Sequence, residues 1–478
     1  MALSNTKHWP LERELVQVLG RDHVITDSET QKPYECDGLS MYCEQPMLVV
    51  LPGSAGEVRK VVQLCHRHNV PLVSRGAGTG LSAGAMPNKD GVLLSLARLD
   101  EILEIDPQAR TARVQPGVRN ASISEAANEF GLYYAPDPSS QIACTIGGNV
   151  AENSGGIHCL KYGLTVHNLV QITFLTAEGN EVVLGNPGLE HTGFDLMALL
   201  TGSEGLLGIV TEVVVRLLPR PVSTQVVVAA FGDLTTAANA VGSVIAAGII
   251  PAGLEMMDHY AIVAAEDYCN AGYPKTARAL LLCELDGSDA EVADYCGKVT
   301  EIFEDNGAFS IRVSQSEEER QLLWKGRKAA FPAVGRISPD YYCMDGTIPR
   351  GKLAEVLNKM SELSDVYELR VANVFHAGDG NLHPLILFDP SIPGEFEKTE
   401  RFGAEILEMC VAVGGSITGE HGVGLEKIRQ MPVQFGDAEI SMFHAIKHCF
   451  DTSGMLNPGK GIPLLKNCQE YRARAKYN

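Results

Sequence analysis

The sequence predicts an α+β fold built from more than one unit, and three observations support this. The 478 residues, 45% of them apolar, are enough for about three folding units with sizeable cores. The chain opens as strand, helix and strand, followed by a glycine-rich loop at residues 75–85. Pro219 and Pro221 then mark a boundary, beyond which strands alternate with longer helices as in a separate α+β unit.

The glycine-rich loop, R-G-A-G-T-G-L-S-A-G-A, follows a short apolar strand at residues 70–74. Its glycines expose backbone N–H groups that can converge on an anion, and phosphate is the natural guest. The loop lacks the lysine of a P-loop, and it matches the dinucleotide fingerprint only loosely, at Gly78, Gly80 and Ala83. An ordinary long turn therefore remains an alternative for this segment.

The remaining elements of the first 220 residues follow from apolar spacing and turn residues. Ser54 and Glu57 form a capping pattern that begins a helix ending near His68, and Gly131 ends a helix that starts near residue 121. A further helix is expected at residues 11–19, and strands at residues 47–51, 92–96, 102–105, 111–114, 169–176 and 181–184.

Residues 135–163 have almost no periodicity and are dense in glycine, asparagine and serine. The segment is too long for a plain connector, and such loops in compact domains are usually functional or disordered. Small apolar residues of the buried type, including Ile142, Ile146 and Val150, favour order. We interpret the segment as wrapped around a ligand.

The second half of the chain is expected to hold the other α+β unit. The nearly uncharged stretch 237–254 is interrupted by Gly248 and Pro251, which favours a buried helix ending near Gly248 over a membrane span. Strands are expected at residues 225–231, 279–284, 309–313 and 369–375, and helices from residue 288 and at 317–331, 351–363, 396–413 and 440–450.

Composition excludes several classes of function. Lys and Arg total 39 against 59 Asp and Glu, a net charge of -20 that repels nucleic acids and anionic lipid surfaces. The 12 cysteines contain no C-x-x-C spacing, which argues against a zinc ribbon, an iron-sulfur cluster or a thioredoxin motif. The first ten residues lack an apolar signal region, so the cytoplasm is the expected compartment.

Two histidine-bearing glycine loops carry the candidate chemistry. His376 and His383 flank A-G-D-G-N-L directly after a strand, so the turn can aim both imidazoles at one point, and Glu420 in G-E-H-G is the obvious third ligand for zinc, iron or manganese. His421 is either a further ligand or, as we favour, a general base. Arg327 is a candidate carboxylate clamp. Structural histidines near a turn and a solvated helical arginine are the competing interpretations.

Five motifs, in this order and spacing, resemble the FAD-linked oxidases and dehydrogenases of the vanillyl-alcohol oxidase (PCMH) type. They are R-G-A-G-T-G-L-S-A-G-A, P-D-P-S-S, C-T-I-G-G-N-V-A-E-N-S-G-G, H-A-G-D-G-N-L-H and G-E-H-G-V-G. The resemblance runs nearly end to end and is strongest to the catalytic, D-type flavoprotein subunits of bacterial glycolate oxidases. It implies a two-subdomain FAD-binding domain over residues 1–220, an α+β cap for the substrate over 221–415, and a C-terminal return at 416–478.

The resemblance also implies a role for individual residues. His376, His383 and Glu420 fall on the metal positions of the 2-hydroxy-acid branch, His421 on its base and Arg327 on its carboxylate-binding arginine. The positions that match FAD contacts are Arg75, Gly76, Ala77, Gly78, Thr79, Gly80, Leu81, Ser82, Pro138, Ser139, Thr145, Gly147, Gly148, Asn149, Ala151, Asn153, Gly155, Gly156, Glu204, Gly208, Ile209 and Asn457. Residues 75–85 contain no histidine, so non-covalent FAD is expected.

The implied reaction is oxidation of a short 2-hydroxy acid, glycolate or D-lactate, to its 2-oxo acid. Leu385 stands where relatives that act on 2-hydroxyglutarate usually have asparagine, which favours a small substrate. A second flavoprotein subunit and an iron-sulfur subunit are the implied electron acceptors, with membrane attachment only through those partners. The alternatives are a D-lactate or D-2-hydroxyglutarate dehydrogenase and, from another class, a non-redox flavin-dependent transferase of the same fold.

Overall fold

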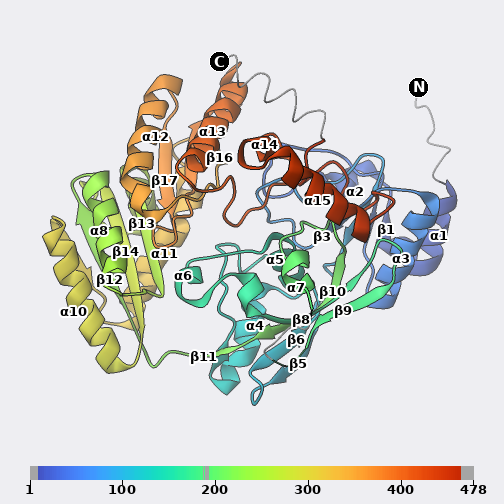
Figure 1. The fold of residues 1–478 in the computed structure, drawn as a ribbon, viewed down its shortest axis with the longest axis horizontal. Coiled ribbons are helices and arrows are strands. Elements are labelled where there is room, and N and C mark those ends of the chain that lie inside the picture. The colour runs from blue at the N-terminus through green and yellow to red at the C-terminus, as the bar shows by residue number, and fades with distance from the viewer. Residues whose placement is uncertain (1–8, 187, 189–192, 465–478) are drawn as a thin grey trace. The chain divides into compact units, whose positions relative to one another are not determined.

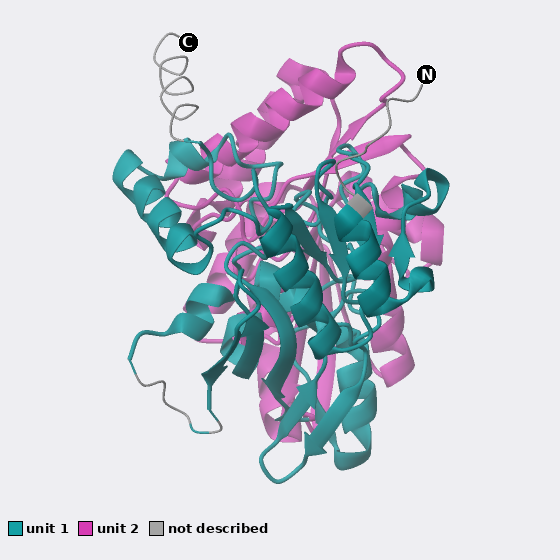
Figure 2. Ribbon diagram, turned by 90° about the vertical axis from the view of Figure 1, so that its right-hand side faces the viewer, with its two compact units in different colours: residues 1–154, 164–219, 421–478 teal, residues 155–163, 220–420 magenta. Residues whose placement is uncertain are grey.

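The computed structural model describes residues 9–186, 188 and 193–464, and it divides into two compact units (Figures 1 and 2). Unit 1 comprises the chain to Ser154, Leu164–Pro219 and the chain from His421. Unit 2 comprises Gly155–Gly163 and Arg220–Glu420. Residues 1–8 and 465–478 lie outside the described residues, so the structure does not describe the first eight residues, on which the expectation about a signal region depends, or the outer ends of the expected domains 1–220 and 416–478.

Unit 1 contains two main sheets and a short two-stranded one. The first sheet has the order β1-β2-β4-β3, with β2 and β3 both parallel to β4. The second is antiparallel, with the order β5-β6-β10-β8-β9, and β7 pairs with β11. The strands are β1 (Val24–Ile25), β2 (Leu48–Val50), β3 (Leu72–Arg75), β4 (Val92–Ser95), β5 (Ile102–Asp106), β6 (Thr111–Val114), β7 (Leu132–Tyr133), β8 (Leu169–Leu175), β9 (Glu181–Gly185), β10 (Ile209–Arg216) and β11 (Leu218–Pro219).

The helices of unit 1 follow the capping signals in the sequence. The Ser54 hydroxyl accepts a hydrogen bond from Glu57 N at 3.2 Å, and the helix that it caps buries Val58, Val61 and Val62. The helices are α1 (Trp9–Leu19), α2 (Ser28–Gln31), α3 (Ala55–His68), α4 (Asn120–Ala127), α5 (Ile146–Glu152), α7 (Leu196–Leu200), α14 (Met431–Gln434) and α15 (Asp437–Phe450). Short 3-10 helices are η1 (Arg21–His23), η2 (Lys32–Tyr34), η3 (Asn128–Phe130) and η4 (Thr165–Asn168).

Unit 2 is built on a seven-stranded antiparallel sheet with the order β15-β12-β14-β13-β17-β18-β16. Its central strands are apolar without alternation, as in A-L-L-L-C-E-L-D-G, because helices cover both faces. The strands are β12 (Ser223–Phe231), β13 (Gly253–Asp258), β14 (Ala279–Gly287), β15 (Ser310–Val313), β16 (Asp340–Cys343), β17 (Val371–Phe375) and β18 (Pro384–Phe388).

Two sets of helices cover the sheet of unit 2. The helices are α6 (Cys159–Tyr162), α8 (Leu234–Ala246), α9 (His259–Cys269), α10 (Asp289–Asp305), α11 (Glu317–Val334), η5 (Arg350–Lys352), α12 (Leu353–Tyr367) and α13 (Glu395–Ala412). Helices α9 and α11 pack together over a buried cluster that takes alternate β12 residues, Val226 and Val228. Phe231 of β12 has the other parity and contacts Phe303 of α10, so α10 lies on the opposite face.

The secondary structure confirms most of the expected elements and corrects two interpretations. Residues 135–163 are not a continuous loop, because α5 and α6 form within them. Strands β13, β16 and β18 and helix α9 were not expected, although helix α8, which precedes β13, ends before Gly248 as predicted. In the part of the chain that the structure describes, no helix combines the length and apolar content that a bilayer span requires.

Candidate functional site

Unit 1 contains a cleft at the C-terminal end of β3 and the N-terminus of α5. Seven of the residues expected at the cofactor line it: Arg75, Gly76, Gly147, Gly148, Ala151, Glu204 and Gly208. Ten other residues line the cleft, and four of them lie within segments expected at the cofactor: Gly84, Ala85, Glu152 and Gly205. The sequence interpretation missed the remaining six, which are Ser74, Leu96, Pro116, Leu200, Ser203 and Val210. Most of these are small or apolar, so the sequence carries no local signal for them.

Several buried polar atoms around this cleft suit a bound ligand. Thr145 Oγ1, Ser82 Oγ and Glu152 Oε2 are buried and have no hydrogen-bond partner among the described residues. A Cβ at Gly76 would stand 2.2 Å from Thr145 Oγ1, so that only glycine leaves room between the loop and α5. Buried polar atoms normally find a partner, and a polar cofactor such as FAD would supply one.

Two buried carboxyl groups share this cleft. The Glu204 oxygens accept hydrogen bonds from Val423 N at 2.7 Å and Gly424 N at 2.6 Å. Burial raises the pKa of both groups, and the neighbouring Glu204 raises the pKa of Glu152 further, to well above its ordinary value. Burial and the Glu204 carboxylate thus both favour the protonated form of Glu152, while the N–H groups of Val423 and Gly424 favour the ionised form of Glu204.

Other side chains expected at the cofactor support the backbone of unit 1. Arg75 Nη1 donates to Cys36 O at 2.5 Å. The Asn149 amide bonds to Asn120 at 3.0 Å, and Asn153 Oδ1 accepts from Val166 N at 2.9 Å. Asn457 Nδ2 donates to Gly84 O at 3.0 Å and to Glu204 O at 2.7 Å. Their direct contact with a flavin stays a prediction.

The expected residues outside the cleft lining lie in three places. Loop 77–82 contacts neighbouring segments, since a Cβ at Gly424 would stand 2.0 Å from Ser82 O. Gly155 and Gly156 belong to unit 2. The other expected positions that do not line the cleft are Pro138, Ser139, Thr145, Asn149, Asn153, Ile209 and Asn457.

Unit 2 brings His376 and His383 together at one hairpin. His376 directly follows β17, and His383 directly precedes its antiparallel neighbour β18. Their ring centroids lie 5.1 Å apart. Glu420 Oε1 lies 3.4 Å from His376 Nε2 and 3.2 Å from His383 Nε2, so both rings point the same nitrogen at one carboxylate oxygen.

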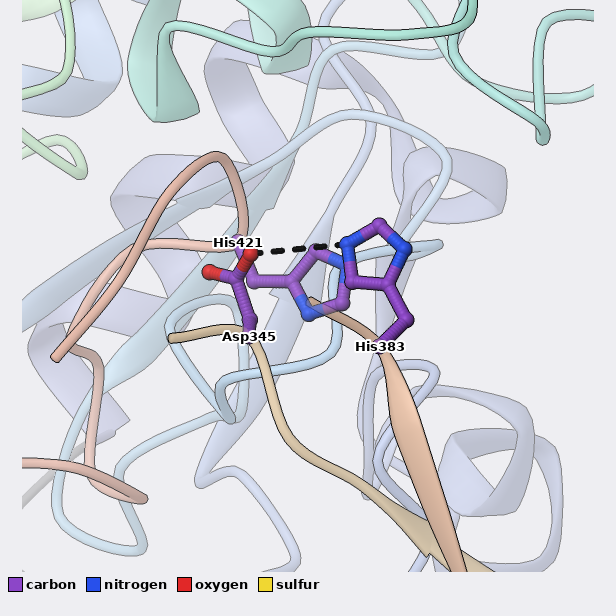
Figure 3. Close-up of side chains that lie close together, drawn as sticks. All are labelled: Asp345, His383 and His421. Carbon is purple, nitrogen blue, oxygen red and sulfur yellow. Dashed lines mark ion pairs between the residues drawn. The ribbon is translucent and has the colours of Figure 1, made fainter. Parts of the chain in front are cut away.

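A second carboxylate, Asp345, fixes the segment that carries Glu420. Asp345 is fully buried, and its Oδ2 accepts hydrogen bonds from the Thr418 hydroxyl at 2.5 Å, Gly419 N at 3.0 Å and Glu420 N at 3.2 Å. Its Oδ1 lies 3.5 Å from His383 Nε2, and Figure 3 shows this carboxylate facing the His383 ring. The sequence interpretation missed Asp345, which lies in the segment Y-Y-C-M-D-G-T-I-P at residues 341–349.

The electrostatics of this cluster suit a cation. Burial alone would raise the pKa of Glu420, but His376 and His383 hold it well below its ordinary value. Burial alone would lower the pKa of His376, yet Glu255 and Glu420 raise it well above 6.5. Nδ1 or Nε2 nitrogens and carboxylate oxygens of His376, His383 and Glu420 lie within 4.8 Å of one another. Two imidazoles and a carboxylate are a set that zinc, iron and manganese all accept.

Arg327 is fully buried on α11 and is engaged by Glu255 of β13. Arg327 Nε lies 2.9 Å, and its Nη2 2.5 Å, from Glu255 Oε2, while Glu255 Oε1 lies 2.7 Å from His376 Nδ1. Burial raises the pKa of Glu255, but His376 and Arg327 together bring it below its ordinary value. Because β13 was not expected, no sequence pattern singled out Glu255. His421 directly follows Glu420 and opens the C-terminal part of unit 1.

Two family models match this chain. The model of the C-terminal domain of FAD-linked oxidases matches residues 220–461, and a model of an FAD-binding domain matches residues 46–185. The crystal structure of p-cresol methylhydroxylase with substrate bound superposes with a TM-score of 0.82, at 16% identity, over 97% of this chain and 98% of that one. This likeness confirms the expected α+β fold with an FAD-binding unit of the PCMH type.

Curated relatives align over nearly the whole chain. Glycolate oxidase subunit GlcD of Escherichia coli (strain K12) is 58% identical over 468 residues, which cover 97% of this chain and 94% of the relative. D-lactate dehydrogenase of Anaerostipes hadrus is 31% identical over 447 residues, covering 91% of this chain and 94% of the relative. The chain therefore belongs to the FAD-linked oxidase family, and it is an oxidoreductase that carries an FAD-binding domain.

Proposed function

We propose that this chain oxidises a short 2-hydroxy acid, glycolate and also D-lactate, to the 2-oxo acid, as the catalytic subunit of a glycolate oxidase or dehydrogenase. The similarity to a glycolate oxidase subunit over 97% of the chain and to a D-lactate dehydrogenase over 91% supports the substrate class. The observation that carries the proposal is the convergence of His376, His383 and Glu420, a cation-binding set, within a flavoprotein of this family.

The FAD-binding domain is residues 1–220 together with 416–478, and residues 221–415 form the cap for the substrate. FAD, when bound, supplies the two-electron acceptor for the hydride of the substrate. The glycines at 76, 147 and 148 let the backbone approach the cofactor, and Thr145 and Glu152 offer it buried polar atoms. Loop 75–85 contains no histidine, which supports non-covalent binding.

His376, His383 and Glu420 would hold a divalent cation, zinc, iron or manganese, which when bound lowers the pKa of the substrate hydroxyl. Asp345 keeps Glu420 in place through the N–H groups of its segment. His421 accepts the hydroxyl proton. Arg327 binds the substrate carboxylate through Nη1, since its Nε and Nη2 are engaged by Glu255.

The reduced flavin must pass its electrons to partner subunits, because the cysteine spacing provides no iron-sulfur relay within this chain. The relative GlcD is a subunit by name, which supports an assembly of several subunits. We propose a second flavoprotein subunit and an iron-sulfur subunit as electron acceptors. The chain is cytoplasmic and reaches the inner membrane only through these partners.

Anaerobic reduction of the bound flavin tests the proposal directly. Loss of flavin absorbance is expected with glycolate and D-lactate in a panel of short D- and L-2-hydroxy acids. His421→Ala is expected to slow reduction by about 100-fold or more, because it removes the base. His23→Ala, in η1 of unit 1, is the control and should behave as the wild type. Reduction of the flavin at the wild-type rate in His421→Ala would contradict the assignment of His421 as the base. If no 2-hydroxy acid reduces the flavin, the proposed substrate class is wrong.

D-2-hydroxyglutarate is the second candidate substrate. Leu385, which stands where relatives that act on 2-hydroxyglutarate usually have asparagine, favours the smaller substrates over it. Leu385 is fully buried in the cluster under α9 and α11, so it fills the core of unit 2 with an apolar side chain. A non-redox transferase of the same fold is the alternative from another class. If the chain is such a transferase, the purified protein will contain FAD but no divalent cation, and no 2-hydroxy acid will reduce the flavin.

A further inference from the structure

Glu255 is a charged residue in the middle of a buried sheet. It lies on β13, its side chain is fully buried, and its neighbours in the strand are Leu254 and Met256. Strand β13 pairs with β17 in a register that sets Met256 opposite Phe375. One step further along this antiparallel register, Glu255 stands opposite His376, so the two side chains emerge on the same face.

The Glu255 carboxylate joins two residues of the proposed site. One oxygen, Oε1, lies 2.7 Å from His376 Nδ1. The other, Oε2, accepts hydrogen bonds from Arg327 Nε at 2.9 Å and Nη2 at 2.5 Å. Arg327 is 1% exposed, so its charge is compensated inside the protein by this carboxylate. An uncompensated charge at either position would be costly, so the two residues depend on each other.

We propose that Glu255 is the positioning residue of the cation site, holding His376 so that Nε2 faces the cation, with Arg327 holding Glu255 in turn. A histidine that donates Nδ1–H to a carboxylate keeps its Nε2 lone pair for a ligand and cannot rotate freely. His376 Nε2 is the nitrogen that lies 3.4 Å from Glu420 Oε1. The inference rests on the proposed function, because it takes His376, His383 and Glu420 as the cation ligands.

The same sheet contains a matched control. Glu284 on the neighbouring strand β14 is also buried, accepts a hydrogen bond from Arg320 Nη1 at 2.8 Å, and lies 2.9 Å from His158 Nε2. Glu255 and Glu284 thus share a histidine partner, an arginine partner and a buried setting. They differ in that His158 is not one of the cation ligands proposed here. A general effect of removing a buried ionised glutamate from this sheet will appear in both variants.

The test measures cation binding itself. FAD-loaded protein is stripped with a chelator, and free Mn²⁺ is followed by electron paramagnetic resonance during a titration with Mn²⁺ alone. Glu255→Gln is expected to bind Mn²⁺ about 10 to 100 times more weakly than wild type, the usual effect of losing the partner of a metal-bound histidine. Glu284→Gln is expected to stay within about threefold of wild type, a smaller change than a lost ligand partner produces. The flavin spectrum reports folding in each sample.

A double variant keeps the test informative if Glu255→Gln does not fold. Glu255→Gln with Arg327→Gln removes both buried charges together and is expected to show the same weakening, whereas Arg327→Gln alone is expected to weaken binding less. Mn²⁺ affinity equal to wild type in a folded Glu255→Gln or double variant would overturn the inference, as would equal weakening in Glu284→Gln. If wild type itself binds no Mn²⁺, Zn²⁺ or Fe²⁺, the proposed cation centre fails, and this inference fails with it.

Discussion

Replacing Asp37 by asparagine is expected to remove a pH dependence from the stability of unit 1. Asp37 is buried in the segment before β2, where a Cβ at Gly38 would stand 2.7 Å from Gly80 O of the glycine-rich loop. Oδ1 accepts a hydrogen bond from Leu39 N at 3.0 Å, but Oδ2 has no partner among the described residues. Burial raises the pKa of Asp37 from 3.8 to about 6, against smaller opposing effects of nearby N–H groups, Lys460 and Arg75.

The sign follows from which state holds the proton more tightly. Between pH 3.8 and about 6 the folded protein keeps a proton on Asp37 that the unfolded chain has released, so stability falls as the pH rises through this window. The full loss is about 3 kcal/mol, and about 2 kcal/mol of it falls between pH 4.5 and 7.5. Asparagine cannot ionise, so Asp37→Asn avoids this loss, although its amide N–H group costs about 1 kcal/mol at every pH if it stays unpaired.

Thermal unfolding of the apoprotein at pH 4.5 and pH 7.5 measures the effect without pH-dependent ligand binding. The difference in melting temperature, Asp37→Asn minus wild type, is expected to be about 4 °C larger at pH 7.5 than at pH 4.5, at roughly 2 °C per kcal/mol. Asp90→Asn, at an exposed position, is the control and should show no such change. A difference for Asp37→Asn that is the same at both pH values would refute the reasoning.

Two further predictions concern the loop after His421 and the carboxyl pair of the cleft. Gly424→Ala is expected to lower both the melting temperature and the FAD content, because Gly424 has φ 50° and a Cβ would stand 2.0 Å from Ser82 O. Gly131→Ala is the control: Gly131 has φ 66° but open space around it, so the substitution should cost only about 1 kcal/mol of stability. Glu152→Gln is expected to preserve stability at pH 7, since glutamine resembles the protonated carboxyl, whereas Glu204→Gln should cost about 2 kcal/mol by weakening the bonds from Val423 N and Gly424 N. Thermal unfolding and the FAD content of the purified protein check the two glycine variants. Urea unfolding checks the two glutamine variants, and equal losses of stability in Glu152→Gln and Glu204→Gln would contradict the assignment of the proton to Glu152.

The sequence predicted the elements whose signals are local. Helix α3 carries its own cap at Ser54 and one apolar face, and the β8–β9 hairpin turns at A-E-G-N. The glycine-rich loop after β3 and the two histidines around one turn are likewise short-range patterns. Such features depend on only a few neighbouring residues, which is why spacing and residue type are enough to place them.

Strand β13 and the residues missed around the site depend on partners far along the chain. G-L-E-M-M-D is a poor match to a buried strand because it contains Glu255, and only contacts with Arg327 and His376, 72 and 121 residues away, compensate that charge. Asp345 acts on residues 418–420, more than 70 positions later. Residue spacing along the chain predicts neither set of contacts, since the order of the strands in the folded sheet decides which distant residues meet. The residue type of Arg327 and the family resemblance suggested a role in binding a carboxylate. Nothing in the local sequence indicates that Glu255 accepts hydrogen bonds from it.

In the histidine cluster, one local hairpin supplies two of the proposed ligands, and residues far along the chain supply and position the third. The hairpin of β17 and β18 alone can bring His376 and His383 within reach of each other, because both follow from one turn. The hairpin cannot supply the third ligand, the Glu420 carboxylate, which comes from a segment without regular structure. That segment therefore needs Asp345 to hold its N–H groups. The two histidines differ in their second carboxylate: Glu255 contacts His376 at Nδ1, whereas Asp345 lies beside His383 Nε2, the nitrogen that also faces Glu420. Precision at the proposed cation site depends on buried acids that never need to touch the substrate.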